Sequence, residues 1–493
     1  MNDECKRKCQ IFTPKENVLQ LLNWVGYKKN LYGKKIIENS CGDGQILIEI
    51  VHRYINDCLR NNLTLKQIKN GLENDIYGAE IDSVHYQKCI NNLDDIAKIY
   101  NITNITWNII QKDILQEKLN TKFDYVVGNP PYIKYKLLDK ETRKFVRENF
   151  DVCSIGKFDY CYAFIEQGIK SLKESGKMSY LIPNSIFKNV FAQQLRDYIK
   201  INLTDIYDYT TEKLFTKKNL ESIDKDILTS SAVIVIDKSK KTKSINYHDL
   251  VNNREIKIMK KDLNNKWIFN INNNVEETNV KKRLGDYFKA SNTIATLYNK
   301  AFVVNNYVQK EDYIITKNNY KIENAILRNA VSPRSLNSKT EEKIIFPYYF
   351  ENGKLRKYTE EEIKSRFPFA YEYLESYKKQ LLKRKSDINA KWYEYGRSQA
   401  ISQSNKKKLL LSTVITKEVK VYELSSDTIP YSGIYITSDE SNLNRAKEIL
   451  ESKEFLQYVK DIGINASGES IRITSKDINN YMFNIGENIW VKK

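Results

Sequence analysis

The chain has 493 residues, and its 80 Lys and Arg against 62 Asp and Glu give a formal net charge of +18. With 41% hydrophobic residues, 17 Gly and 8 Pro, the composition excludes a collagen-like, low-complexity or largely disordered protein. No apolar run is long enough to span a bilayer, and Met1–Gln10 lacks the apolar core of a signal peptide. We therefore expect a soluble cytoplasmic protein of two or three domains.

The cysteine and histidine counts bear on metal binding and redox state. Seven cysteines all lie before residue 162, no two of them form a CxxC pair, and the chain has only three His. These counts argue against a zinc site, and we expect no metal. Reduced thiols, as in cytosolic proteins, are the expectation for this cysteine usage.

The excess positive charge is concentrated in the second half of the chain. Residues 251–493 hold 42 basic and 30 acidic residues, a balance of +12, whereas residues 1–250 hold 38 and 32, a balance of +6. A lysine-rich solvated surface and a binding surface for a polyanion both explain this distribution.

Residues 36–135 alternate short apolar strands with helical stretches, which is the pattern of a parallel α/β sheet. Beyond them, an amphipathic helix at Ala163–Leu172 precedes two more strands. The predicted strands are Lys35–Glu38, Asp75–Glu80, Trp107–Ile110, Phe123–Val127, Gly176–Ile182 and Ser231–Ile236, with further helices at Ile46–Leu59 and Ser83–Tyr100.

The chain turns polar between Asp237 and Val280, with Lys-rich and Asn-rich runs. We therefore predict a first domain at residues 1–255, a linker at 256–280 and a second domain at 281–493. The second domain has no clear strand–helix alternation but many short apolar stretches, so we expect a mixed α/β or β-rich unit there.

A glycine-containing loop, Asn39-Ser40-Cys41-Gly42-Asp43-Gly44, follows the first predicted strand. A Gly-x-Gly turn lets the backbone approach a ligand, and the helix N-terminus after it offers N–H groups. Glu80, at the end of the second strand, is placed to accept both hydroxyls of a ribose, although a surface carboxylate is the other interpretation. Because no GxGxxG fingerprint is completed, the pattern favours a nucleoside without phosphates.

Asp113 follows the third predicted strand. A carboxylate at that position could accept a hydrogen bond from the exocyclic amine of adenine. A turn or cap residue is the other interpretation, since Asp is common at strand-to-loop junctions.

The sequence Gly128-Asn129-Pro130-Pro131-Tyr132 follows the fourth predicted strand. Ligands of open α/β sheets bind at the carboxyl ends of the strands, where this loop is expected to lie. The two prolines stiffen the loop and remove two backbone donors. The Asn129 side-chain oxygen and the Pro130 carbonyl can then accept hydrogen bonds from one planar amino group, and Tyr132 offers a face on which a base can stack.

Together, these motifs resemble those of the gamma class of S-adenosylmethionine-dependent DNA adenine-N6 methyltransferases, the NPPY type found in bacterial restriction–modification systems. The resemblance covers nearly the whole chain, and the motifs occur in the family's order. It implies a Rossmann-like methyltransferase sheet in an α/β catalytic domain, followed by a C-terminal target-recognition domain of mixed α/β structure. The sequence departs from the family at Asn39, where proline is usual, and at Ile46, where phenylalanine is frequent; altered packing is expected there.

The resemblance also assigns roles to individual residues. The catalytic loop is Asn129, Pro130, Pro131 and Tyr132. The residues expected at the S-adenosylmethionine site are Thr13, Glu38, Cys41, Gly42, Gly44, Glu80, Ile81, Asp113, Ile114 and Phe164. Among them Cys41 is expected only to pack, because methyl transfer from a sulfonium needs no thiol nucleophile. Phe215 is the candidate for a second aromatic ring that stacks on a flipped adenine.

Basic residues near the catalytic loop and in the second half suggest contacts with DNA. Lys134 and Lys136 directly follow the loop and are expected, with Tyr132, to contact DNA. Basic and aromatic residues also interleave at Tyr371–Lys385. A solvated basic face is the other interpretation of these lysines, and phosphate contacts would set register without reading sequence.

The implied reaction is direct methyl transfer to N6 of an adenine that has left the duplex stack. Two alternatives are a methyltransferase acting on rRNA or on a release-factor glutamine, and an inactive DNA-binding specificity subunit. The long basic second half favours DNA over the first alternative. The intact catalytic loop, with Glu80 and Asp113, counts against the second.

The resemblance implies partners and a location as well. Double-stranded DNA is the expected partner, and a separately encoded restriction endonuclease is a further candidate. We expect a monomer that does not bind membranes, associated with the nucleoid in a bacterial cytoplasm. A fused N-terminal nuclease is not expected, because the sheet begins within 40 residues of Met1.

Overall fold

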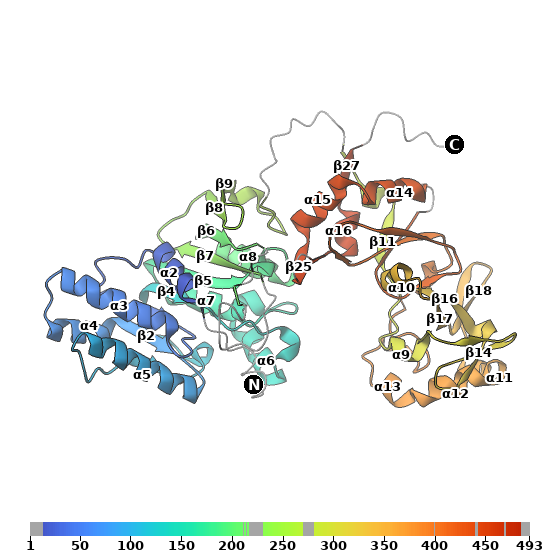
Figure 1. Ribbon diagram of the computed structural model, residues 1–493, viewed down its shortest axis with the longest axis horizontal. Helices are drawn as coiled ribbons and strands as arrows, with labels where there is room; N and C mark the ends of the chain where they lie inside the picture. Colours follow the sequence, from blue (N-terminus) through green and yellow to red (C-terminus); the bar gives the residue numbers. More distant parts are fainter. Residues whose placement is uncertain are drawn as a thin grey trace. The chain divides into compact units, whose positions relative to one another are not determined.

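The computed structural model describes residues 13–210, 212, 214–215, 230–269, 281–398, 400–438, 442–467 and 470–484. The chain divides into two compact units (Figure 1). Unit 1 comprises Met1–Asn273 with Ile464–Glu469, and unit 2 comprises Asn274–Gly463 with Ser470–Lys493.

Unit 1 is built on a nine-stranded sheet. Its strands are β1 (Ile36–Glu38), β2 (Ile76–Ala79), β3 (Asn108–Ile110), β4 (Phe123–Gly128), β5 (Leu172–Pro183), β6 (Leu203–Asp208), β7 (Ser231–Asp237), β8 (Ser244–Asp249) and β9 (Arg254–Met259). They lie in the order β3-β2-β1-β4-β5-β7-β6-β8-β9. The strands from β3 to β5 are parallel, and β7 is antiparallel to both of its neighbours. The carboxyl ends of β1 to β4 therefore meet at one edge of the sheet.

Helices cover both faces of this sheet, so successive strand residues are buried on opposite sides. Ile36 and Val127 pack into the apolar cluster formed with α2, α3, α4 and α5, whereas Ile37 and Val126 pack into the cluster formed with α6, α7 and α8. The helices are α2 (Lys15–Val25), α3 (Gln45–Arg60), α4 (Leu65–Asp75), α5 (Ser83–Ile99), α6 (Lys140–Asn149), α7 (Cys161–Ser171) and α8 (Gln193–Lys200).

The predicted strands and helices of unit 1 are present with shifted ends, and the predicted α/β fold class is confirmed. The sheet extends further than expected, because β8 and β9 add two strands that were not predicted. β9 crosses the predicted boundary between the first domain and the linker 256–280, and Trp267, within that segment, is fully buried in the unit 1 core. Unit 1 thus continues beyond residue 255, to Asn273.

Unit 2 contains several small sheets. Its strands are β10 (Lys281–Arg283), β11 (Lys289–Asn292), β12 (Val303–Val304), β13 (Val308–Gln309), β14 (Tyr313–Ile315), β15 (Lys321–Glu323), β16 (Leu327–Val331), β17 (Glu342–Ile345), β18 (Tyr348–Glu351), β19 (Lys354–Lys357), β20 (Lys408–Leu411), β21 (Val414–Ile415), β22 (Val421–Leu424), β23 (Ile429–Pro430), β24 (Ile434–Thr437), β26 (Ser470–Arg472) and β27 (Met482–Asn484). β25 (Ile464–Ser467) belongs to the segment grouped with unit 1.

Two four-stranded sheets organise the apolar cores of unit 2. One has the order β11-β24-β20-β22 and packs with α14, α15 and α16; the other has the order β12-β17-β16-β23 and packs with α9, α11, α12 and α13. The helices are α9 (Asn299–Phe302), α10 (Pro333–Ser338), α11 (Glu360–Arg366), α12 (Pro368–Ser376), α13 (Lys378–Leu382), α14 (Leu443–Leu450), α15 (Lys453–Ile462) and α16 (Ser475–Asn479). This is the mixed α/β structure expected of the second domain. Among the described residues, no helix has the length and apolar character that a membrane span needs.

Candidate active site

Two glycines shape the loop that joins β1 to α3. Gly42 and Gly44 have φ angles of 54° and 89°, in the left-handed region that favours glycine, and Gly44 is the N-cap of α3. A Cβ on Gly44 would lie 2.8 Å from the Cys89 Sγ. The Cys41 N–H donates a hydrogen bond to the Ala79 carbonyl at 3.0 Å, which fixes the loop against the end of β2.

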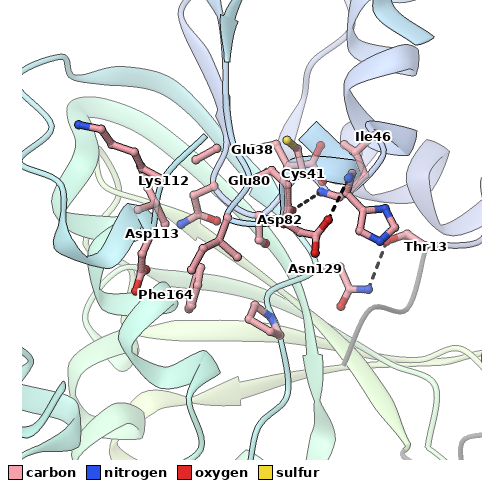
Figure 2. Close-up of a pocket in the computed structure, with 18 of the residues that line it drawn as sticks. Thr13, Glu38, Cys41, Ile46, Glu80, Asp82, Lys112, Asp113, Asn129 and Phe164 are labelled. Carbon is pink, nitrogen blue, oxygen red and sulfur yellow. Dashed lines mark hydrogen bonds between the residues drawn. The ribbon is translucent and has the colours of Figure 1, made fainter. Parts of the chain in front are cut away.

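Glu80 joins this loop to the one that follows β2. Its Oε2 accepts a hydrogen bond from the Gly42 N–H at 2.9 Å, and its Oε1 accepts one from the Asp82 N–H at 2.8 Å (Figure 2). Asp82 in turn caps α5, since its Oδ1 accepts hydrogen bonds from the N–H groups of Val84 and His85. Two charge-assisted hydrogen bonds thus hold the Glu80 carboxylate in one orientation, and each of its oxygens retains capacity for a further donor.

Glu38, the last residue of β1, is only 3% exposed. Within the described part of the chain, its Oε2 has no hydrogen-bond partner. Burial, reinforced by Cys89, Asp43 and Glu80 nearby, raises the pKa of Glu38 well above its usual range. A buried carboxyl oxygen without a partner is energetically costly, so a donor or a cation bound beside it would be favourable.

The two departures from the resembling family have a structural role in this loop. The Asn39 Oδ1 accepts a hydrogen bond from the Tyr180 hydroxyl at 2.5 Å, which ties the loop to β5. Ile46, in the first turn of α3, is buried in the core cluster. Both residues thus pack around a loop that keeps its two glycines.

Asp113 both caps a turn and faces the cavity near the sheet edge. Its Oδ1 accepts a hydrogen bond from the Leu115 N–H at 3.1 Å, and its Oδ2 accepts one from the Gln116 side-chain amide at 3.0 Å. The Tyr160 hydroxyl donates to the same Oδ2 at 3.5 Å. The rings of Tyr160 and Phe164 meet edge to face with centroids 5.4 Å apart, so aromatic surface adjoins this carboxylate.

The loop after β4 brings Asn129 beside the N-terminal segment. The Asn129 Nδ2 donates a hydrogen bond to the Thr13 Oγ1 at 3.3 Å (Figure 2). The end of the loop is fixed by the Tyr160 N–H, which donates to the Ile133 carbonyl at 2.9 Å. The Tyr132 ring packs against both core clusters; its hydroxyl is buried without a hydrogen-bond partner among the described residues, and burial raises its pKa well above the usual range.

These loops line one pocket of about 1020 Å³, open solvent at its mouth included. Many of the residues predicted from the sequence line this pocket: Thr13, Glu38, Cys41, Gly42, Glu80, Ile81, Asp113, Ile114, Asn129, Pro131 and Phe164. The lining residues not predicted as site residues are Asn39, Ser40, Gln45, Ile46, Ala79, Asp82, His85, Lys112, Ile133 and Tyr160. Two sequence signals could have identified further lining residues. Asp82 is a potential helix cap two positions after Glu80, and Lys112 directly precedes Asp113.

The remaining predicted residues lie outside the pocket lining. Lys134 and Lys136 are exposed directly after the loop that follows β4. Phe215 is fully buried in the core cluster with α2 and α3, so its ring presents no open face to a base in this structure. Gly44, Pro130 and Tyr132 shape or support the loops without lining the pocket itself.

The order β3-β2-β1-β4-β5 and the pocket at the carboxyl ends of β1 to β4 define a doubly wound α/β protein with a nucleoside-sized site. Residues 28–215 match the family described as Eco57I restriction-modification methylase. This segment is therefore similar to restriction–modification methylases, which confirms the resemblance found in the sequence.

Several curated proteins are similar to parts of the chain. The Type II methyltransferase M.BstVI of Geobacillus stearothermophilus is 30% identical over 194 residues, covering 37% of this chain and 34% of that protein. The Type II restriction enzyme and methyltransferase RM.Eco57I of Escherichia coli is 22% identical over 404 residues, covering 70% of this chain and 38% of that protein. The chain thus spans little more than a third of the length of either relative.

Solved structures share the fold over most of the chain. The Type IIL restriction-modification enzyme MmeI, solved in complex with DNA, has a TM-score of 0.63 at 13% identity and covers 94% of this chain and 64% of its own. The Type ISP restriction-modification enzyme LlaGI, solved with a DNA substrate mimic, has a TM-score of 0.54 at 14% identity and covers 95% of this chain and 46% of its own. At these identities the likeness establishes the fold.

Proposed function

We propose that this chain is a DNA methyltransferase of a restriction–modification system that transfers a methyl group from S-adenosylmethionine to N6 of adenine. The observation that carries the proposal is the presence of Asn129 in the same pocket as Glu80 and Asp113. This arrangement puts an amide that can bind an amino group beside carboxylates suited to a nucleoside. The relatives named as Type II methyltransferases support the same reaction class.

The charged and hydrogen-bonding groups of the pocket fit the proposed cofactor. Four carboxyl groups, those of Glu38, Glu80, Asp82 and Asp113, line it against the cationic Lys112 and the titratable His85. An acidic lining suits a ligand that carries ammonium and sulfonium charges. The unpartnered Glu38 Oε2 is a natural acceptor for an ammonium group, and the oriented Glu80 carboxylate suits two ribose hydroxyls. When bound, S-adenosylmethionine supplies an electrophilic methyl group on its sulfonium.

The chain's own residues would then position the acceptor. The Asn129 side-chain oxygen and the Pro130 carbonyl accept hydrogen bonds from one amino group, which orients its nitrogen toward the methyl group and makes it more nucleophilic. The Asn129 amide is pre-oriented by its hydrogen bond to Thr13. No covalent enzyme intermediate is needed, and the Cys41 thiol, whose pKa is raised by its hydrogen bond with Cys89 and by burial, takes no part.

An adenine inside a duplex cannot present its amino group to this pocket, so we infer that it flips out of the stack. Tyr132 is the proposed stacking surface, and the exposed Lys134 and Lys136 are the proposed contacts to the flanking phosphates. Residues 251–493, most of which belong to unit 2, carry +12 of the net charge of +18, and unit 2 is the proposed target-recognition domain. A separately encoded endonuclease is a proposed partner, and the bacterial cytoplasm is the proposed location.

The test is transfer of label from S-[methyl-³H]adenosylmethionine to unmethylated duplex DNA by the purified chain, compared with Asn129→Ala and Thr13→Val. Loss of the amide should reduce turnover by about 100-fold or more while cofactor affinity changes little. Thr13→Val removes only the orienting hydroxyl, and we expect a loss of about tenfold or less. Wild-type turnover in Asn129→Ala would contradict the proposed role of the loop.

A further inference from the structure

Unit 2 carries a shallow polar pocket at the face of the β12-β17-β16-β23 sheet. Its lining comes from four separate segments of the chain, and it consists of Gln309, Asn324, Leu327, Arg328, Asn329, Lys343 and Asp427. Asn329 and Lys343 are directly opposite each other in the register of β16 and β17. Polar side chains thus converge here from positions more than 100 residues apart in the sequence.

The backbone that carries Arg328, Asn329 and Lys343 belongs to closely packed strands. Ala330 and Leu327 of β16, and Ile344 and Ile345 of β17, are buried in the apolar core of the sheet. Close packing fixes the strands, so a side chain that stands on them has a defined origin and direction. A recognition site requires such pre-organisation, because each immobilised flexible group lowers the affinity that its contact can give.

Hydrogen bonds orient these side chains and leave donors available on Arg328, Asn329 and Lys343, whereas the Gln309 amide donates to both the Asn324 Oδ1 and the Lys310 carbonyl. The Lys343 Nζ donates to the Asn329 Oδ1 at 2.7 Å, and the Gln309 Nε2 donates to the Asn324 Oδ1 at 3.0 Å. The Arg328 NH1 donates to the Leu327 carbonyl at 2.9 Å. By the donor inventory of each group, the lysine, the guanidinium and the exposed Asn329 amide can all donate further hydrogen bonds.

The pocket also contains acceptors. The Asp427 carboxyl has its pKa lowered by a hydrogen bond from Ser425, by a backbone hydrogen bond and by the nearby cations of Lys408 and Arg328, so it is ionised and accepts hydrogen bonds. The Gln309 side-chain oxygen is a second acceptor group. The charged side chains of the lining, Arg328, Lys343 and Asp427, sum to a net charge of +1.

The combination of hydrogen-bond donors and acceptors in this pocket distinguishes contacts to DNA bases from contacts to phosphates. Phosphate oxygens only accept hydrogen bonds, so a phosphate site is lined by donors and a carboxylate there would repel the ligand. The edges of base pairs in the major groove offer both donors and acceptors, and they are matched by guanidinium, amide and carboxylate groups. The chemistry of the pocket therefore fits base edges better than the sugar–phosphate backbone.

We propose that Gln309, Arg328, Asn329 and Lys343 form a base-reading site that sets part of the DNA sequence methylated by this chain. The inference rests on the proposed function, and it assigns specificity to named side chains of unit 2. Asn329, whose oxygen accepts a hydrogen bond from Lys343, retains its side-chain amino group as a donor. Arg328 is suited to a guanine edge. The Gln309 Nε2 donates to the Asn324 Oδ1 and the Lys310 carbonyl, so Gln309 offers its side-chain oxygen as an acceptor for the amino group of a base.

The experiment is methylation of unmethylated bacterial genomic DNA with S-adenosylmethionine, followed by single-molecule sequencing of the modified sites. Wild-type protein is compared with Asn329→Ala, Gln309→Ala and the double variant. We expect each single change to relax the motif at one base position, with discrimination there reduced about tenfold or more, and the double variant to relax two positions. Asn337→Ala, at an exposed position on α10, is the matched control and should leave the motif unchanged.

The outcomes separate this inference from the proposed function. A defined wild-type motif that all three variants retain with unchanged discrimination overturns the base-reading site and leaves the methyltransferase assignment standing. A uniform fall in methylation of every sequence, with the motif unchanged, also overturns it, because that result indicates phosphate contacts. If the wild type modifies no adenine in DNA, the proposed function fails and the inference fails with it. Both exposed substitutions remove side chains without creating a core cavity, so folding should be retained.

Discussion

Replacing Glu80 by glutamine probes the contact that connects the loop after β1 with the loop after β2, the two loops proposed to bind the cofactor. Each Glu80 oxygen accepts a backbone hydrogen bond, from Gly42 at 2.9 Å and from Asp82 at 2.8 Å. A carboxamide offers only one oxygen, so in Glu80→Gln an NH₂ group must face one of these two N–H donors. The loss of one charge-assisted hydrogen bond corresponds to about 1.5–3 kcal/mol.

We expect two measurable effects of Glu80→Gln. The free energy of unfolding should fall by about 2 kcal/mol, because one backbone donor loses its acceptor. The affinity for S-adenosylmethionine, measured by isothermal titration calorimetry, should fall about 10- to 100-fold, because the side chain loses its charge and its fixed orientation. Glu148→Gln is the control. The exposed Glu148 has its Oε1 4.0 Å from the Lys144 Nζ, and loss of this ion pair should change the free energy of unfolding by less than about 0.5 kcal/mol. Unchanged stability and affinity in Glu80→Gln would refute the reasoning.

Three further substitutions test other parts of the structure. Tyr180→Phe removes the hydroxyl that donates to the Asn39 Oδ1, and it should lower the free energy of unfolding by about 1–3 kcal/mol in denaturant titrations. An unchanged free energy of unfolding would mean that another donor replaces the tyrosine hydroxyl at the Asn39 Oδ1. Gly44→Ala should lower stability and cofactor affinity together, since a positive φ and the Cys89 Sγ both oppose a side chain; a fully active, equally stable variant would contradict the required geometry. Burial lowers the pKa of Lys408 to about 8, below its unfolded value, so the folded state binds fewer protons between these two pKa values. The stability of the wild type relative to Lys408→Met should therefore rise by about 3 kcal/mol between pH 8 and pH 10.5, and a flat or falling difference would contradict the lowered pKa of Lys408 in the folded state.

The parallel part of the sheet could be predicted because its signals are local. The apolar pair Ile36-Ile37 before the glycine loop and the run Phe123–Val127 before the proline loop indicate strands buried on both faces. Helices between them follow from apolar periodicity. The strand β9, by contrast, has mostly exposed side chains, and only its pairing with β8 defines it. Its Ile256 and Ile258 alternate with charged residues and pack against the core, but this short alternation stands beside polar runs, which is why the segment 256–280 was predicted to be a linker.

The fold of unit 2 could not be predicted in detail because its sheets join distant segments. β11 pairs with β24, and β16 pairs with β23, about 100 or more residues further along the chain. Most of these strands have five residues or fewer, too short to show a clear period of two. The sequence indicated a mixed α/β or β-rich unit, but the order of its strands follows only from the pairing of segments that are distant in the chain.

Residues of the candidate site could be predicted where a polar side chain directly follows a predicted strand. Glu80, Asp113 and Asn129 each follow a strand whose carboxyl end lies at the same edge of the sheet, and all three line one pocket. His85 was missed because it reaches the pocket from α5, through a capping turn that does not identify it as a site residue. Phe215 was chosen from its place before the last strand, and it is buried in the core instead of the pocket lining.

The central claim is that the acceptor is the amino group of adenine in DNA. The most direct measurement is mass spectrometry of nucleosides from duplex DNA that has been incubated with the purified chain and S-adenosylmethionine carrying a CD₃ group. The account predicts N6-(trideuteromethyl)deoxyadenosine with the wild type and none above background with Asn129→Ala. Label in cytosine, or in rRNA or a protein while DNA stays unlabelled, would contradict it.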